Sequence, residues 1–148
     1  MKNIFAAVLI AISTIAASVT GAMAEGEPHR LAIHVDQNDP QVMNMALNNA
    51  ANVASYYKEK GEEVIIELVA YGPGLNMLVK DKSPVADRIS SMSLEMENIS
   101  FAACGNTLAG MSKKAGHDVP LISEANVVPS GVVRLMELQE DGYSYVRP

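Results

Sequence analysis

The sequence has little cysteine, no tryptophan and few basic residues, and each shortage excludes a class of protein. A single cysteine, Cys104, excludes an internal disulfide and argues against a dithiol oxidoreductase, which needs a cysteine pair. The 11 Lys and Arg residues are outnumbered by 17 Asp and Glu, giving a net charge of −6. Binding to a phosphate backbone needs basic residues gathered on one face, so the composition argues against nucleic acid as a partner.

Long apolar runs are also missing, apart from one at the N-terminus. Lys2 precedes an apolar stretch over residues 4–17, and residues 22–24 (Ala-Met-Ala) have the small side chains of a signal-peptide cleavage site. The stretch is shorter than the about 20 strongly apolar residues that span a bilayer, and Ser and Thr dilute it. We therefore predict a signal peptide over 1–24, cleavage after Ala24, and a periplasmic or secreted product without membrane association.

The chain that remains after cleavage has the size of one domain. It carries 10 basic and 17 acidic residues, because Lys2 is the only charged residue of the leader. A chain of this length can bury a core without disulfides. We predict a flexible lead-in over 25–30 and a single domain over 31–148.

Short apolar runs alternate with helical patterns through the domain. The predicted strands cover 31–35, 64–69, 99–102, 126–128 and 143–146. The predicted helices run from Asp39-Pro40 to Gly61, from Ser83-Pro84 to about Met96, from Asn106 to about Lys114, and from Pro129-Ser130 to Glu140, with a turn over 71–74. Strands that alternate with helices indicate βαβ units. We predict an α/β three-layer sandwich around a five-stranded, mainly parallel sheet.

The first predicted helix shows a stripe of residues at helical spacing. Its members are Val42, Met45, Ala46, Asn49, Val53 and Tyr56. Such a stripe is typical of the face that packs on a core. Asn49 is the polar member, and it either ties down a backbone segment or binds a ligand.

Candidate functional residues follow the predicted strands, because open α/β sheets bind ligands beyond the carboxyl ends of their strands. They are His34, Tyr71, Gly72, Cys104, Gly105, Asn106 and Ser130. Cys104 precedes a helix, where free N–H groups and the helix dipole favour a thiolate. Gly105 would let a ligand approach the backbone, and Asn106 offers an amide donor. The alternative is a buried cysteine that packs as a small hydrophobe.

His34 has two interpretations, and the remaining patterns predict neither a metal nor a cofactor. His34 could stabilise a thiolate at Cys104 if the first strand neighbours the third, or it could be a histidine hydrogen-bonded at a strand end. The three histidines lack metal-ligand spacing, and the methionines suit core filling. Residues 72–74 (Gly-Pro-Gly) lack the spacing of a phosphate-binding loop.

Several short motifs occur in an order that resembles a known family. They are 34–36 (His-Val-Asp), 47–49 (Leu-Asn-Asn), 71–74 (Tyr-Gly-Pro-Gly), 103–107 (Ala-Cys-Gly-Asn-Thr), 128–132 (Val-Pro-Ser-Gly-Val), 137–139 (Glu-Leu-Gln) and 142–145 (Gly-Tyr-Ser-Tyr). Together they resemble the DsrE/DsrF-like family over 31–148, in particular its small exported single-domain branch. The resemblance implies a flavodoxin-like α/β fold, homo-oligomers that are trimers or hexamers, and sulfur relay through a persulfide on a cysteine that corresponds to Cys104.

Two functions follow from the residues and the resemblance together. The first is a sulfur carrier, at most sulfurtransferase-like, that exchanges sulfur between Cys104 and a donor or acceptor protein or a small sulfur species. The second is a non-catalytic periplasmic binding module for a small ligand or a partner protein, with Cys104 in the lining. The sulfur-relay members are cytoplasmic, whereas this chain is predicted to be exported, so relay to tRNA or to a cytoplasmic sulfite reductase is not expected.

Overall fold

The computed structural model describes residues 26–148, so the predicted signal peptide and its cleavage after Ala24 lie outside the described residues. The strands are β1 (His29–Val35), β2 (Val64–Ala70), β3 (Ile99–Cys104), β4 (Ala125–Val128) and β5 (Ser144–Val146). The helices are α1 (Pro40–Lys60), the 3-10 helix η1 (Gly72–Leu78), α2 (Ala86–Glu95), α3 (Gly105–Ala115) and α4 (Gly131–Glu140). The strands form one sheet in the order β4-β3-β2-β1-β5, and every pairing is parallel. The predicted α/β fold with a five-stranded parallel sheet is confirmed.

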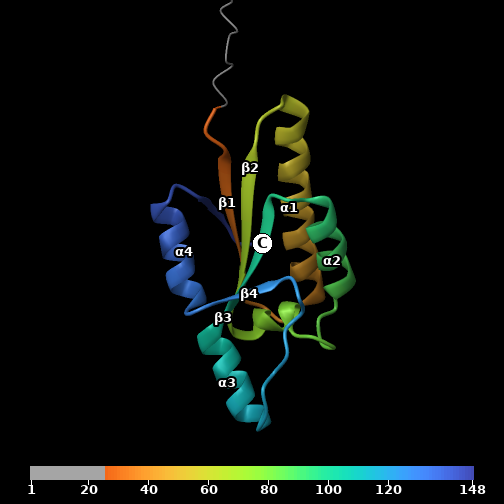
Figure 1. The fold of residues 1–148 in the computed structure, drawn as a ribbon, viewed down its shortest axis with the longest axis vertical. Coiled ribbons are helices and arrows are strands. Elements are labelled where there is room, and N and C mark those ends of the chain that lie inside the picture. Colours follow the sequence, from red (N-terminus) through yellow and green to blue (C-terminus); the bar gives the residue numbers. More distant parts are fainter. Residues whose placement is uncertain (1–25) are drawn as a thin grey trace, which may run out of the picture.

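The sheet is covered by helices on both faces, which gives the predicted three layers (Figure 1). Helices α1 and α2 pack on one face, where Ile33, Leu68 and Phe101 belong to the larger of two core clusters. Helix α4 packs on the other face, where Leu135 and Leu138 meet smaller side chains of the strands. Strand residues alternate between these faces, because successive side chains of a strand point in opposite directions.

Helix α1 begins and ends with the signals that its sequence predicts. Asp39 accepts a hydrogen bond of 2.8 Å from the Gln41 N–H, Pro40 is the first helical residue, and Gly61 ends the helix with φ of 70°. An Asp cap satisfies one of the free N–H groups of the first turn, and a left-handed glycine closes the last turn.

The predicted core stripe of α1 is wrong for several of its members. The buried residues are Met43, Ala46, Leu47 and Ala50, whereas Met45 and Tyr56 are about half exposed and Asn49 is partly buried. The helix is apolar around much of its circumference, so two overlapping stripes fit the helical period. Packing against the sheet decides which of the two stripes is buried, and the buried stripe is the one that contains Met43, Ala46, Leu47 and Ala50.

Several boundaries differ from the prediction, and three of the differences are informative. His29 and Arg30 are not lead-in but open β1, and the His29 N–H donates to the Glu63 carbonyl over 2.8 Å. Helix α2 begins at Ala86, two residues after Pro84, because the Ser83 hydroxyl accepts from the Val85 N–H and forms a turn first. The turn predicted over 71–74 continues as η1.

Within residues 26–148, no helix combines the length and the apolar character that crossing a membrane requires.

Candidate functional site

Cys104 lies beside the point where the chain leaves two neighbouring strands, β3 and β4, toward opposite faces of the sheet. After β3 the chain enters α3, whose Leu108 and Met111 pack against the core cluster under α1. After β4 it enters α4, which covers the other face of the sheet. The crevice between two such neighbouring strands is the place where open α/β sheets bind ligands. Cys104 is the last residue of β3 and pairs with Val128, the last residue of β4.

Cys104 lies at the N-termini of two helices, and groups of both helices lower the pKa of its thiol. Burial, which leaves 5 % of the residue exposed, raises the pKa of the Cys104 thiol. The Thr107 hydroxyl and the N–H groups of Gly131, Thr107 and Asn106 outweigh that effect, so the net pKa is below its ordinary value. Cys104 is also the N-cap of α3, although its side chain makes no capping hydrogen bond there. The net effect of the surroundings of Cys104 therefore favours the ionised sulfur over the thiol.

Two glycines allow this close arrangement of helices. A Cβ at position 131 would lie 2.9 Å from the Cβ of Tyr71 and 3.1 Å from the Cβ of Cys104. A Cβ at position 105 would lie 3.0 Å from the Val128 carbonyl oxygen. Glycine at 131 therefore lets α4 start next to Cys104 and Tyr71, and Gly105 lets α3 start close to the end of β4.

The loop after β2 reaches the site through one hydrogen bond. Gly72 has a φ of 53°, which favours glycine, and its N–H donates to Oγ1 of Thr107 over 2.9 Å. Asn106 has an exposed side chain, and its N–H also donates to the Pro129 carbonyl over 3.3 Å. The predicted site residues Gly72 and Asn106 thus contribute to this region through their backbones, by bonds to Thr107 and Pro129.

Four side chains form a row across the carboxyl end of the sheet on the α4 face. They are Tyr145, His34, Tyr71 and Cys104, from β5, β1, the end of β2 and β3. The His34 ring stacks on Tyr71 with 4.5 Å between centroids, and its Nδ1 lies 2.7 Å from the Tyr145 hydroxyl. Because β2 separates β1 from β3, His34 does not neighbour Cys104, and the condition for a direct role of His34 on the thiolate is not met.

His34 is held neutral by its surroundings. It is 4 % exposed, and its Nε2 has no hydrogen-bond partner within residues 26–148. Burial lowers the pKa of His34, with a further lowering by Arg147, and nearby Asp36 only partly opposes this. Burial likewise raises the pKa of Tyr71. Both rings of the stacked pair are therefore uncharged near neutral pH.

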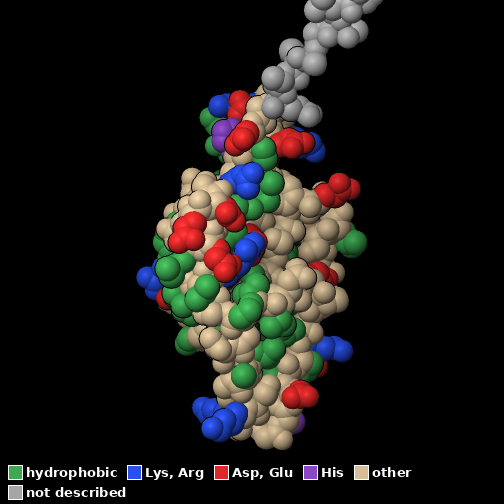
Figure 2. Space-filling view, turned by 60° about the vertical axis from the view of Figure 1, so that its left-hand side comes forward, with side chains coloured by type: hydrophobic (Ala, Val, Ile, Leu, Met, Phe, Trp, Pro, Cys, Tyr) green, Lys and Arg blue, Asp and Glu red, His purple; other side chains and the backbone are tan. Residues whose placement is uncertain are grey.

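Ser130 lies on a neighbouring groove and not among the donors around the sulfur. The groove has a volume of about 450 Å³ and runs between α4 and the end of β4, with Ser130 and Val133 in its lining. A bidentate ion pair from Arg134 to Glu67, with two contacts of 2.7 Å, forms part of its wall. Hydrophobic side chains also reach the surface on this side of the molecule (Figure 2).

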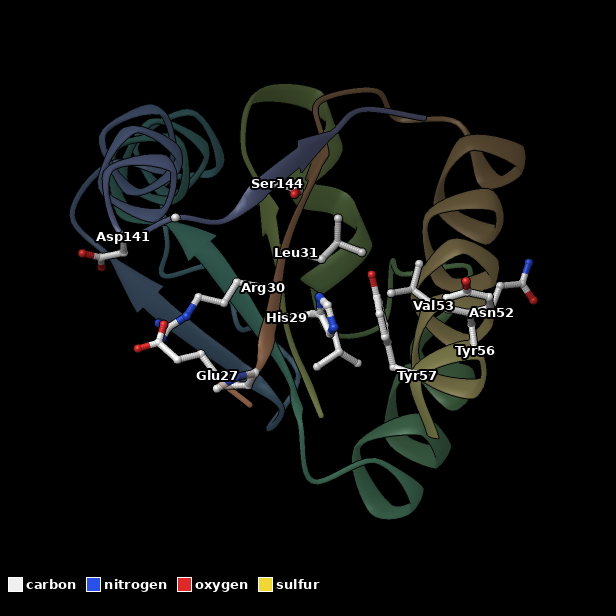
Figure 3. Close-up of a pocket in the computed structure, with 13 residues that line it drawn as sticks. Glu27, His29, Arg30, Leu31, Asn52, Val53, Tyr56, Tyr57, Asp141 and Ser144 are labelled. Atoms are coloured by element: carbon white, nitrogen blue, oxygen red, sulfur yellow. The ribbon is translucent and has the colours of Figure 1, made fainter. Parts of the chain in front are cut away.

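A larger cavity of about 570 Å³ lies at the opposite end of the sheet (Figure 3). Its walls come from the start of β1 and from the C-terminal half of α1, and the His29 ring stacks on Tyr57 with 3.8 Å between centroids. The first residues of β2 and β5, Val64 and Ser144, also line it. The cavity is therefore separated from Cys104 by the length of the strands.

Sequence reasoning missed two residues of the site, Thr107 and Gly131. Thr107 occupies the third position of the helix that Cys104 caps, and this spacing brings a side chain back to the cap. Gly131 is the first residue of α4, next to the N-cap Ser130. The position of Thr107 three residues after Cys104 could be read from the sequence. The contact of α4 with Cys104 could not, because it depends on the strand order.

The site and fold together define a class, that of small parallel α/β proteins with one cysteine at the switch point of the sheet. The sequence model of the DsrE/DsrF-like family matches residues 31–148, and the chain belongs to this family. Among solved structures, MTH1491 from Methanobacterium thermoautotrophicum, described as a protein of unknown function, is 32% identical with a TM-score of 0.66. The match covers 81% of this chain and 99% of that one. No curated protein matches the chain.

Proposed function

We propose that this member of a sulfur-relay-related family is an exported sulfur carrier that holds a persulfide on Cys104. The observation that supports the proposal most is the position of Cys104 at the N-termini of α3 and α4, together with the lowered pKa of its thiol. N–H groups at helix N-termini stabilise anions, and a persulfide is an anion at neutral pH. The same donors that lower the pKa of the thiol stabilise the loaded form.

The loading step needs no oxidant besides the sulfur donor. The Cys104 thiolate attacks the outer sulfur of a polysulfide, a new S–S bond forms, and the adjacent S–S bond of the donor breaks. The shortened polysulfide leaves with the electron pair, so charge and sulfur are conserved. Within the chain no second cysteine can resolve the persulfide into a disulfide, so the sulfur stays available for an external acceptor.

The burial of Cys104 favours small sulfur species as donors. With 5 % of the residue exposed, a bulky donor cannot reach the sulfur unless the site opens. Polysulfide is small and anionic, and its charge suits the two helix N-termini. Polysulfide is therefore the probe of choice for loading.

Intact mass spectrometry tests the proposal. After incubation with polysulfide and removal of the reagent, the wild type is expected to gain one sulfur atom, and dithiothreitol is expected to remove it. Cys104→Ser, which keeps the size of the side chain approximately, is expected to gain nothing. An unchanged mass for a folded wild type with a reduced thiol would contradict the carrier function.

The second candidate, a non-catalytic binding module, is favoured by the same burial of Cys104 and by the Nε2 of His34, for which residues 26–148 supply no hydrogen-bond partner. A buried nitrogen without a partner is a position where a ligand atom can bind. The rate of alkylation of the thiol across pH separates the two functions. A thiol that reacts with a pKa below the ordinary value of about 8.5 supports the carrier, and a thiol inert in the folded protein supports the binding module.

We also propose that the exported chain works as a homo-oligomer, a trimer or hexamer. Support comes from four exposed apolar residues on α4 and β4, each about half exposed. They are Val127, Val132, Val133 and Met136. Val133 also lines the groove beside Ser130, so an interface that includes α4 would adjoin the Cys104 site. Export is proposed from residues 1–24, and donor and acceptor would then be met outside the cytoplasm.

A further inference from the structure

An ion pair joins the beginning of α4 to the middle of the sheet. Arg134 donates from Nε and Nη2 to the two carboxylate oxygens of Glu67, over 2.7 Å each. Glu67 belongs to β2, the central strand, and is 8 % exposed. Arg134 is the fourth residue of α4, and its N–H donates to the Ser130 carbonyl over 2.9 Å. The guanidinium therefore anchors the end of the helix that lies nearest to Cys104.

Apolar packing alone leaves the position of α4 along the strands weakly determined. The cluster between α4 and the sheet consists of Leu135 and Leu138 against small strand side chains, which are Ala32, Val69 and Ala102. Burial of apolar surface is non-directional, so these contacts hold the helix against the sheet without fixing where it begins. A bidentate guanidinium–carboxylate pair fixes both a distance and a direction. The ion pair therefore determines where along the sheet α4 begins.

The first residue of α4 lies against Cys104, so the position of the helix matters there. A Cβ at Gly131 would lie 3.1 Å from the Cβ of Cys104. A helix N-terminus favours a neighbouring anion, and this effect falls off within one turn. A small displacement of α4 would therefore weaken its effect on the sulfur.

The ion pair itself is too distant to act on the sulfur directly. Glu67 pairs with Ser100, and Ser100 precedes Cys104 by four residues on β3. At about 3.3 Å per residue the separation along the strand is roughly 13 Å. The two charges of the pair also oppose each other. Any effect of the pair on Cys104 must therefore pass through α4.

We propose that Arg134, through its ion pair with Glu67, is a positioning residue that holds the N-terminus of α4 against Cys104. The inference deepens the proposed carrier function and rests on it for its biological meaning. Replacing a buried ion pair by apolar residues often costs little stability, so its use can lie in selecting one arrangement of packed elements. Here the arrangement that it selects is the one that keeps Cys104 ionised and ready to accept sulfur.

The test is the pH profile of Cys104 alkylation by iodoacetamide in the folded protein. The double variant Glu67→Met/Arg134→Met leaves no unpaired buried charge, so it is expected to fold without the anchor. Its midpoint is expected to lie above that of the wild type by about half a pH unit, the size of a helix-terminus effect. Tyr71, which flanks Gly131, stays uncharged while Cys104 titrates, because burial raises the pKa of its phenol.

Arg134→Lys is the second variant, and it separates the charge from the geometry. Lysine keeps the positive charge beside Glu67 and so preserves the fold, but it cannot form the bidentate bond. Its midpoint is expected to move in the same direction as that of the double variant. A wild-type midpoint in Arg134→Lys would show that the position of α4 does not depend on the bidentate bond, which overturns the inference.

Arg88→Met is the matched control on the other face of the sheet. Arg88 of α2 also anchors one element to another, since its guanidinium donates to the side-chain oxygens of Asn44 and Asn48 on α1. Arg88→Met is expected to lower stability while leaving the Cys104 profile unchanged. An unchanged midpoint in the double variant, or an equal shift in Arg88→Met, would overturn the inference.

Failure of this inference is distinguishable from failure of the carrier function. If wild type gains a sulfur atom from polysulfide but the double variant keeps the wild-type profile, the carrier stands and Arg134 does not position α4 for it. If the double variant shifts the profile but no wild-type persulfide forms, Arg134 positions α4 beside a thiol that serves another purpose.

Discussion

The buried His34 is the residue whose charge is most restricted by the fold. Its Nδ1 pairs with the Tyr145 hydroxyl, its ring stacks on Tyr71, and its Nε2 has no partner within the described residues. A protonated imidazole would carry a second donor into this enclosed place, where no acceptor compensates for the lost water. The folded state therefore favours the neutral ring.

This environment predicts an acid-dependent loss of stability. Well above pH 6.5 the His34 ring is neutral in both the folded and the unfolded state. As the pH falls below 6.5, the imidazole of the unfolded chain becomes protonated, whereas that of the folded protein stays neutral. The free energy of unfolding is expected to fall by at most about 1.4 kcal/mol per pH unit from this source, until the lowered pKa is reached. In His34→Asn, whose amide can still meet Tyr145, denaturant titrations between pH 7 and 5 are expected to show a smaller slope.

A slope in His34→Asn equal to that of the wild type would show that other groups cause the acid dependence. Asp36 and Arg147, paired over 2.9 Å beside His34, are common to both proteins, so their contribution cancels in the comparison.

At this scale the sequence predicted the position of the candidate cysteine but not its neighbours in the sheet. Cys104 could be placed at a strand end because an apolar run precedes it and a helical pattern follows it. The roles of His34 and Tyr71 depend on which strands are neighbours, and no pattern in the sequence gives the order β4-β3-β2-β1-β5.

Among the elements, α4 has the most demanding fit, because its first residue touches both Tyr71 and Cys104. In Gly131→Ala the added methyl would lie 3.1 Å or less from side-chain carbons of both residues. Overpacking of this kind costs about 1–3 kcal/mol of unfolding free energy. The helix is also expected to move its N–H away from the sulfur, which raises the pKa of Cys104. Urea denaturation and the alkylation profile measure the two effects.

Gly110→Ala is the control for this substitution. Gly110 lies within α3, and a Cβ there meets no atom within 4 Å. Because alanine favours a helix over glycine, the change is expected to stabilise the protein by about 0.5–1 kcal/mol and to leave the thiol unaffected. A Gly131→Ala protein as stable as Gly110→Ala, with an unshifted profile, would contradict the close fit of α4.

The positions of the helices and strands were largely predictable from capping and periodicity, whereas the face of α1 that is buried was not. The Asp39-Pro40 signal places the start of α1 correctly, since both residues act within one turn of the helix. The buried stripe of α1 was misassigned because Met45 and Met43 are equally apolar, and only the position of the sheet distinguishes them. Capping residues and periodicity therefore determine where a helix begins and ends, whereas contacts with the sheet determine which of its faces is buried.

For the whole molecule, the exposed apolar residues of α4 predict where copies associate. Met136 is 55 % exposed, and a charge placed there meets water in the monomer but would be buried in an interface. Met136→Glu is therefore expected to convert the proposed trimer or hexamer to monomer in light scattering, with little change in the stability of the monomer.

Leu94→Glu is the control, because Leu94 is 84 % exposed on α2, which packs on the other face of the sheet. It is expected to keep the oligomer of the wild type. A monomeric wild type at micromolar concentration would contradict the assembly, and dissociation by Leu94→Glu alone would move the interface to α2.

The pairing of β5 with β1 has a consequence for how the chain reaches its final form. Tyr145 and His34 are 111 residues apart, and β5 pairs with β1 at the edge of the sheet. A chain that emerges from its N-terminus must therefore leave one edge of β1 without a neighbour until almost the entire domain has appeared. During that interval the open edge can be recognised by chaperones or by other unfolded chains. Vectorial emergence thus delays completion of the sheet, and this delay is compatible with the export that we propose from residues 1–24, because an exported chain crosses a membrane before it folds.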